Sequence, residues 1–190
     1  MTIVSRIALL TVCVSVLLLT SCASREQLQS KSAVVPADMN LSGTWVLRDE
    51  QQSGSPLLSD AELEFQIPPA KPSRSRKKKG ASLVNVFLQR GSRLKITQTK
   101  DGLFVSFDRS VVEEYRFGEN RVISVGPVEA SRVSGWEGQA YVIETLTDDG
   151  YKLVEHYRLE NNGTLLVRKA AIFKKDSLAT SFVQEYDKVQ

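Results

Sequence analysis

The sequence is poor in the residues that build metal centres and thiol chemistry. Its 190 residues include two cysteines, Cys13 and Cys22, and one histidine, His156. Both cysteines lie near the N-terminus, so the rest of the chain offers no disulfide, no thiolate ligand and no cysteine nucleophile. A single histidine also excludes a site built from several imidazoles. We therefore expect no metal and no cofactor, and a domain stabilised by its hydrophobic core alone.

Long hydrophobic runs are also scarce. The one clear run, Ile7 to Leu19, has 13 residues and follows a single cation at Arg6. A membrane-spanning helix needs about 20 apolar residues, whereas this shorter length is typical of the central region of a signal peptide. The run ends in Leu19-Thr20-Ser21-Cys22, which is a leucine, two small residues and a cysteine.

These four residues resemble the lipobox of bacterial lipoproteins. The resemblance implies that residues 1–21 are a signal peptide removed after Ser21, and that Cys22 carries the acyl chains, palmitate among them, that hold the chain to a membrane. Ala23 and Ser24 follow with no aspartate after the cysteine, a pattern that implies the periplasmic face of the outer membrane. The alternative is an ordinary signal peptide that is cut nearby, after Ala23.

The remaining chain divides into a short leader and one domain. Residues 22–40 are rich in Ser, Gln, Lys and Ala, which predicts a flexible tether. From residue 41 to residue 190 the pattern is that of a single β domain. Residues 68–80 interrupt it with three prolines and a run of cations, and we expect this insertion to be disordered.

Within the domain, apolar and polar residues alternate as half-buried strands require. Leu94 and Ile96 alternate with cations, and Asp101-Gly102 and Asp149-Gly150 mark hairpin turns. One short helix is predicted at residues 81–90, where Leu83, Val84, Phe87 and Leu88 share a face. Nine to eleven short strands follow from this pattern, including one at residues 61–67. The fold class is therefore mostly β, an antiparallel meander closed as a barrel or a sandwich.

The order of several motifs is similar to a broad set of uncharacterised, lipocalin-like envelope proteins of bacteria. The shared features are the opening Leu41-Ser42-Gly43-Thr44-Trp45, a basic insertion, a short helix, Trp136-Glu137-Gly138, and Glu155-His156-Tyr157-Arg158-Leu159. The resemblance implies an antiparallel β fold and brings no known activity. The Gly43-x-Trp45 opening also resembles that of lipocalins, which implies a carrier of a hydrophobic ligand.

No catalytic residues are expected. His156 shares its side of a strand with Lys152, Arg158 and Glu160, which predicts a solvent-facing imidazole. The adjacent acids Glu113 and Glu114 point to opposite faces of a strand and so make no catalytic dyad. Trp45 and Trp136 are candidates to line a ligand pocket, or else to fill the core of the barrel or cover its end.

The basic insertion is the most distinctive feature after the lipobox. Its cations are Lys71, Arg74, Arg76, Lys77, Lys78 and Lys79, and without them the acids of the chain outnumber the remaining bases. This segregated charge favours binding to an anionic surface, such as anionic lipid, lipopolysaccharide or an acidic envelope protein. A solvated loop without a partner is the alternative reading. We expect no nucleic-acid partner, because the envelope holds little of it and no aromatic residue interleaves the run.

The sequence therefore leads to three functional hypotheses. The first is a membrane-anchored envelope lipoprotein whose β domain binds or scaffolds without catalysis. The second is a lipocalin-like carrier of a lipid or small hydrophobic ligand. The third, an enzyme, would need His156 or an acidic pair inside a cleft, which the strand pattern opposes.

Overall fold

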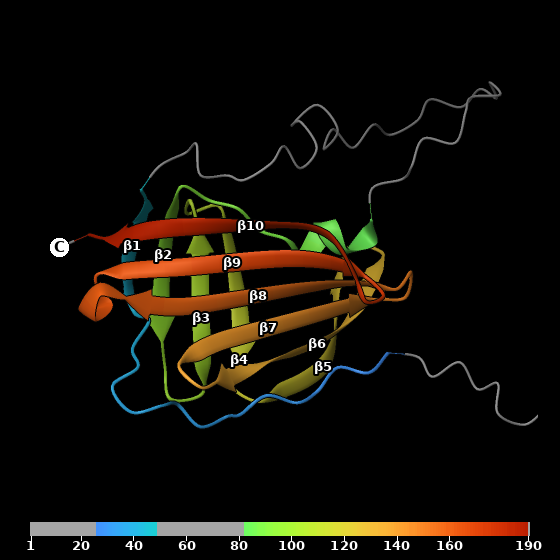
Figure 1. Ribbon diagram of the computed structural model, residues 1–190, viewed down its shortest axis with the longest axis horizontal. Coiled ribbons are helices and arrows are strands. Elements are labelled where there is room, and N and C mark those ends of the chain that lie inside the picture. Colours follow the sequence, from blue (N-terminus) through green and yellow to red (C-terminus); the bar gives the residue numbers. More distant parts are fainter. Residues whose placement is uncertain (1–25, 49–81, 190) are drawn as a thin grey trace, which may run out of the picture.

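The computed structural model describes residues 26–48 and 82–189. Most of these residues lie in antiparallel strands that wrap around one core (Figure 1). The strands are β1 (Gly43–Leu47), β2 (Arg93–Gln98), β3 (Gly102–Phe107), β4 (Val111–Arg116), β5 (Glu119–Val125), β6 (Val128–Glu137), β7 (Ala140–Thr147), β8 (Tyr151–Glu160), β9 (Leu165–Lys174) and β10 (Ser177–Lys188).

The ten strands form one antiparallel sheet that is nearly closed into a barrel. Their hydrogen-bonded order is β4-β3-β2-β1-β10-β9-β8-β7-β6-β5, so β1 pairs with β10, the last strand of the chain. The two edge strands, β4 and β5, are consecutive in sequence but are not neighbours in that order. The mostly β, antiparallel fold predicted from the sequence is confirmed, and of the two predicted forms, barrel and sandwich, it takes the barrel.

Alternation along each strand decides which side chains enter the barrel. In β2, Leu94 and Ile96 are buried while Arg93 and Lys95 are exposed. In β8, Leu153, Glu155 and Tyr157 are buried on the inner face. Short turns connect the strands, and Asn162 between β8 and β9 has a φ of 54°, a conformation that asparagine tolerates better than most residues.

One end of the barrel is covered by a short 3-10 helix, η3 (Leu83–Phe87). The Ser82 hydroxyl accepts a hydrogen bond from the Val84 amide, and Val84 and Phe87 turn inward. Both pack with Leu153, Ile172, Phe182 and their neighbours in one of two buried clusters. A helix was predicted at residues 81–90; it is present there but shorter, because only the i, i+3 pair of Val84 and Phe87 is buried.

The segment before β1 differs from the flexible tether expected over residues 22–40. Its described part, residues 26–40, lies along the outside of the barrel (Figure 1), and we call residues 26–41 the strap. Ser32 exchanges two backbone hydrogen bonds with Trp136, and the Lys31 ammonium lies 2.5 Å from Glu137 and 2.7 Å from Glu144. Composition suggested a solvated linker, but paired charge and backbone bonds hold this segment in place.

The strap also closes the barrel end opposite η3. Val35 and Met39 pack against the second buried cluster, which contains Leu41, Trp45 and Trp136. The Gln98 amide group donates to the Met39 carbonyl at 3.1 Å, and its oxygen accepts from the Leu41 amide at 2.9 Å. The barrel is therefore covered at both ends by segments of its own chain.

Several predicted features lie outside the described residues. They are the signal peptide 1–21, Cys22, the strand at 61–67 and the basic insertion 68–80. Among residues 26–48 and 82–189, no helix is long and apolar enough to cross a membrane.

Candidate functional site

The two tryptophans considered as pocket residues lie inside the barrel. Trp45 is fully buried and Trp136 is 3% exposed, and both belong to the cluster that the strap covers. The Trp45 indole donates to the Leu41 carbonyl at 3.1 Å. The Trp136 ring packs edge-on against Tyr141 at 5.4 Å between centroids, yet its indole nitrogen has no hydrogen-bond partner among the described residues.

The interior contains a fully buried arginine, Arg168. The guanidinium of Arg168 forms an ion pair with Glu155 and donates to the Gln184 side chain at 3.0 Å and to the Gln89 carbonyl at 2.8 Å. Its guanidinium carbon also lies 5.2 Å from the centre of the Phe107 ring. Burial by itself lowers the pKa of Arg168, but attraction to nearby groups including Glu155 outweighs this and raises it. The internal charge is thus neutralised by the chain itself.

Side chains bridge the opening between the edge strands β4 and β5. From β6, the Arg132 guanidinium lies 3.3 Å from the Glu113 carboxylate, and the Ser134 hydroxyl donates to the Arg116 carbonyl at 2.9 Å. From β5, Arg121 donates to the Glu114 carbonyl at 3.4 Å. Glu113 and Glu114 point to opposite sides of β4, as their adjacency in the strand predicted.

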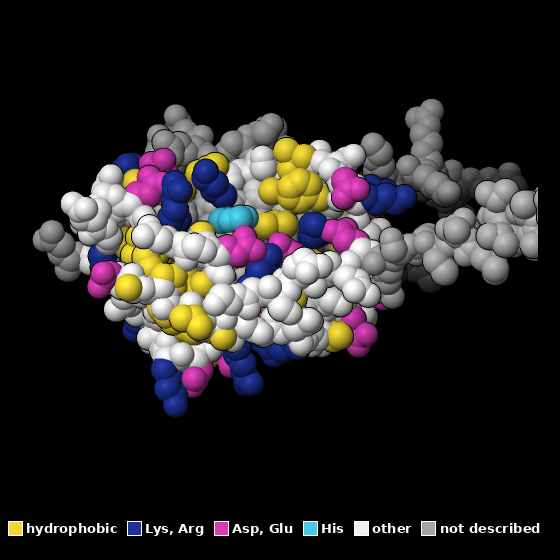
Figure 2. All heavy atoms as spheres, turned by 60° about the horizontal axis from the view of Figure 1, so that its bottom comes forward, with side chains coloured by type: hydrophobic (Ala, Val, Ile, Leu, Met, Phe, Trp, Pro, Cys, Tyr) yellow, Lys and Arg dark blue, Asp and Glu magenta, His cyan; other side chains and the backbone are white. Residues whose placement is uncertain are grey.

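His156 lies on the outer face of β8, as predicted, but it is half-buried rather than free in solvent. It is the one cyan side chain in Figure 2. Burial lowers its pKa, while the charges of Glu137 and Glu144 raise it in part. Within the described ranges, no three His, Cys, Asp or Glu side chains gather as metal ligands.

Two open hollows are present on the surface. One, of about 510 Å³, lies beside the start of the strap and mixes acidic, polar and apolar side chains. It is lined by Glu26, Gln27, Leu28, Asn120, Val122, Glu129, Ala130, Ser131, Leu146 and Asp148. Its charged lining residues are all acids, and one of them, Glu26, forms an ion pair with Lys152.

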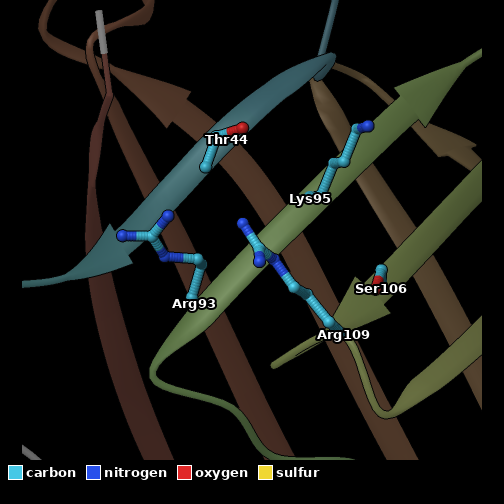
Figure 3. Close-up of a pocket in the computed structure, with 5 residues that line it drawn as sticks. All are labelled: Thr44, Arg93, Lys95, Ser106 and Arg109. Carbon is cyan, nitrogen blue, oxygen red and sulfur yellow. The ribbon is translucent and has the colours of Figure 1, made fainter.

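The other hollow, which we call the basic hollow, has a volume of about 410 Å³ and is lined by Thr44, Arg93, Lys95, Ser106 and Arg109. Lys95 pairs directly with Thr44 of β1 and with Ser106 of β3, so these three side chains form a row on the outer face of the sheet. Arg109 belongs to the turn between β3 and β4, and its side chain runs back over β2 (Figure 3).

The acid that precedes Arg109 in the turn, Asp108, is bound by Ser92 and by the Arg93 backbone. The Asp108 carboxylate accepts hydrogen bonds from the Arg93 amide at 2.8 Å and from the Ser92 amide at 3.1 Å and hydroxyl at 3.2 Å. On the neighbouring strand β10, Glu185 and Asp187 pair with Arg48. Among the described residues, the side chains of Arg93, Lys95 and Arg109 form no ion pair.

Sequence reasoning did not find the basic hollow. It found the outward positions of Arg93 and Lys95 from the alternation of β2, but not their neighbours, because Thr44 and Arg109 join them only through strand pairing and a turn. Cys22 and the predicted cations of residues 71–79 lie outside the described residues, so they are not part of this geometry.

No protein-family model matches the chain, and no curated protein matches its sequence. Similar solved structures include lipid binding protein 8 of Caenorhabditis elegans, at 13% identity, with 78% of this chain and 94% of that chain covered and a TM-score of 0.48. Secretory abundant heat soluble protein 4 of Ramazzottius varieornatus is 14% identical over 87% of this chain and all of its own, with a TM-score of 0.45.

Proposed function

We propose that this chain is a non-enzymatic lipoprotein of the bacterial envelope, whose barrel binds or scaffolds its partner close to the membrane. Acyl chains on Cys22 would hold it to the periplasmic face of the outer membrane. The candidate partners are anionic lipid, lipopolysaccharide or an acidic envelope protein, met by the outer surface and by the cations Lys71, Arg74, Arg76, Lys77, Lys78 and Lys79.

The observation that carries this proposal is the strap. Glu26 forms an ion pair with Lys152 near the start of β8, so only residues 23–25 separate the barrel from Cys22. Four peptide steps reach about 14 Å at most. An anchor on Cys22 would therefore hold the η3 end of the barrel against the lipid surface, whereas a free tether would let the barrel stand away from it.

Two chemical features of that end agree with a lipid surface. Leu83 is 45% exposed, Val125 40% and Leu178 58%; Leu83 begins η3, Val125 ends β5, and Leu178 lies at the start of β10. The described chain also resumes at Ser82, three residues after the last cation of the basic run, Lys79. Exposed apolar groups beside cations are the combination that binds anionic membranes.

Anchoring and orientation are tested separately on the full chain produced in a Gram-negative host. Intact mass and membrane fractionation report acylation, and Cys22→Ala should abolish both the added mass and the membrane association. For orientation, a fluorophore is attached to the acylated protein at Leu178→Cys or at the opposite end at Val34→Cys, which is 76% exposed. Lipid-borne quenchers should act on position 178 and spare position 34; equal quenching would contradict the orientation.

A second candidate function is a carrier of a lipid or other hydrophobic ligand. The observation in its favour is the opening between β4 and β5, where the barrel wall consists of side chains rather than backbone hydrogen bonds. The buried Arg168 and the aromatic clusters occupy interior volume that a carrier would use. Native mass spectrometry and a solvent extract of the purified chain test this function. A bound compound of defined mass supports the carrier function, and the mass of the protein alone contradicts it.

A further inference from the structure

Three cations converge on the outer face of the barrel, and none of them forms an ion pair among the described residues: the adjacent carboxylate, Asp108, is instead bound by Ser92 and the Arg93 amide. Arg93 and Lys95 project from the same side of β2, and the Arg109 guanidinium lies between their side chains (Figure 3). Like charges held this close repel one another. A bound anion would remove that repulsion, so the arrangement is suited to an anionic ligand.

The backbone conformation of the turn supports this placement of Arg109. Asp108 and Arg109 have φ values of 48° and 61°, and the Ser110 amide donates to the Phe107 carbonyl at 2.9 Å. These are the two central positions of a hairpin turn that favours Asn and Gly. Asp108 has a structural reason to be there, because its carboxylate bonds to Ser92 and Arg93. Arg109 has no such bond, and what it contributes is a guanidinium aimed over β2.

The charge and shape of the hollow select among anions. Three positive charges match a phosphomonoester, which carries close to two negative charges, better than a carboxylate or a phosphodiester with one. Arginine forks bind phosphate oxygens in pairs, and the hydroxyls of Thr44 and Ser106 flank Lys95 on the floor. A volume of about 410 Å³ leaves room for the small group that bears the phosphate.

We propose that the hollow formed by Thr44, Arg93, Lys95, Ser106 and Arg109 binds a phosphomonoester group. This inference gives the binding role proposed above a ligand chemistry, but it requires only the folded barrel and not the lipid on Cys22. The phosphate has two possible sources, a lipid headgroup at the membrane surface and a small soluble phosphorylated compound.

The test uses the full chain in neutral detergent micelles, titrated with glycerol 3-phosphate by calorimetry at low and at physiological salt. One-to-one, saturable binding is expected, and Arg93→Gln and Arg109→Gly should each weaken it about tenfold or more. The control is Arg158→Gln, which removes one positive charge from an exposed pair with Glu160 on β8. Affinity that falls equally in the control would show general charge attraction and overturn the site.

Arg109→Gly also separates binding from folding. Glycine adopts a φ of 61° without strain, so this variant should melt at the same temperature as the parent or higher while losing the ligand. Undiminished binding by Arg109→Gly, or no saturable binding by the parent at millimolar glycerol 3-phosphate, would overturn the proposal.

Binding to vesicles of two lipid compositions distinguishes the two possible sources of the phosphate. Phosphatidylcholine vesicles containing phosphatidic acid carry a phosphomonoester, and those containing phosphatidylglycerol carry only a diester. With a headgroup as source, the parent should bind the phosphatidic acid vesicles more tightly, lose that preference in Arg109→Gly, and be displaced by glycerol 3-phosphate. With a soluble source, only the calorimetric binding should appear. Cys22→Ala removes the lipid anchor but leaves calorimetric binding and vesicle binding measurable. The anchoring proposal and the phosphate proposal can therefore fail independently of each other.

Discussion

Arg168 and Glu155 form an ion pair inside the barrel, where their side chains are 0% and 2% exposed. They come from adjacent strands, β9 and β8, and both point into the core. Gln184 and the Gln89 carbonyl each accept a further hydrogen bond from the guanidinium. A charge this deeply buried is tolerated only while it is paired and hydrogen-bonded.

Removing one partner of this pair should be severe. Glu155→Gln leaves the Arg168 charge uncompensated and should lower the free energy of unfolding by about 3–5 kcal/mol, measured by urea denaturation. The double variant Glu155→Gln with Arg168→Met should regain part of that loss. As a control, Glu160→Gln breaks the exposed pair with Arg158 and should cost no more than about 1 kcal/mol. Equal losses at both positions would contradict a special role for the buried pair.

Strand β8 illustrates which features of this interior could be predicted from the sequence. Alternation places Leu153, Glu155 and Tyr157 on one side of the strand, and the structure confirms that this side is buried. The partner of Glu155 was not predictable in the same way, because Arg168 reaches it only through the β8–β9 pairing. Patterns along one strand indicate which face is buried, whereas contacts between strands depend on register.

The strap and the basic hollow were missed for related reasons. In the strap, polar composition indicated a solvated linker, and nothing in the sequence identifies Glu137 and Glu144 as partners of Lys31. In the hollow, Thr44 and Lys95 are separated by a long stretch of chain and become neighbours only when β1 pairs with β2. Local propensity carries no information about such distant partners.

The two tryptophans should respond differently to the same substitution. Trp45→Phe removes a buried hydrogen bond to the Leu41 carbonyl, whereas Trp136→Phe removes an indole donor that has no partner among the described residues. Both changes lose a similar ring volume, so the hydrogen bond decides the difference. Trp45→Phe should be more destabilising than Trp136→Phe by about 1 kcal/mol, measured by chemical denaturation. A larger loss at Trp136 would indicate that its indole has a partner in solution.

The strap should depend on the absence of a side chain at Gly135. A Cβ there would lie 2.5 Å from the Ser32 carbonyl oxygen and 2.8 Å from the Lys31 Cβ, so Gly135→Ala should displace the strap and expose the bond after Lys31 to trypsin. Gly138→Ala is the matched control, because its φ is 57° but nothing lies within 4 Å of the added Cβ. The control should lose stability, by about 1–2 kcal/mol, without faster cleavage after Lys31. Cleavage at the parent rate in Gly135→Ala would show that the strap is not held at this point.

His156 should make stability depend on pH. Burial lowers its pKa in the folded chain below the ordinary value of 6.5, with Glu137 and Glu144 opposing the shift in part. The unfolded chain therefore binds the proton more readily, so stability is highest above about pH 7 and falls as the pH drops through 6.5 toward the folded pKa. Urea midpoints measured between about pH 7.5 and 5.5 should decrease for the parent and change less for His156→Gln. The parent and His156→Gln contain the same carboxylates. If the urea midpoint depended on pH equally in both, the loss of stability would come from those carboxylates and not from His156.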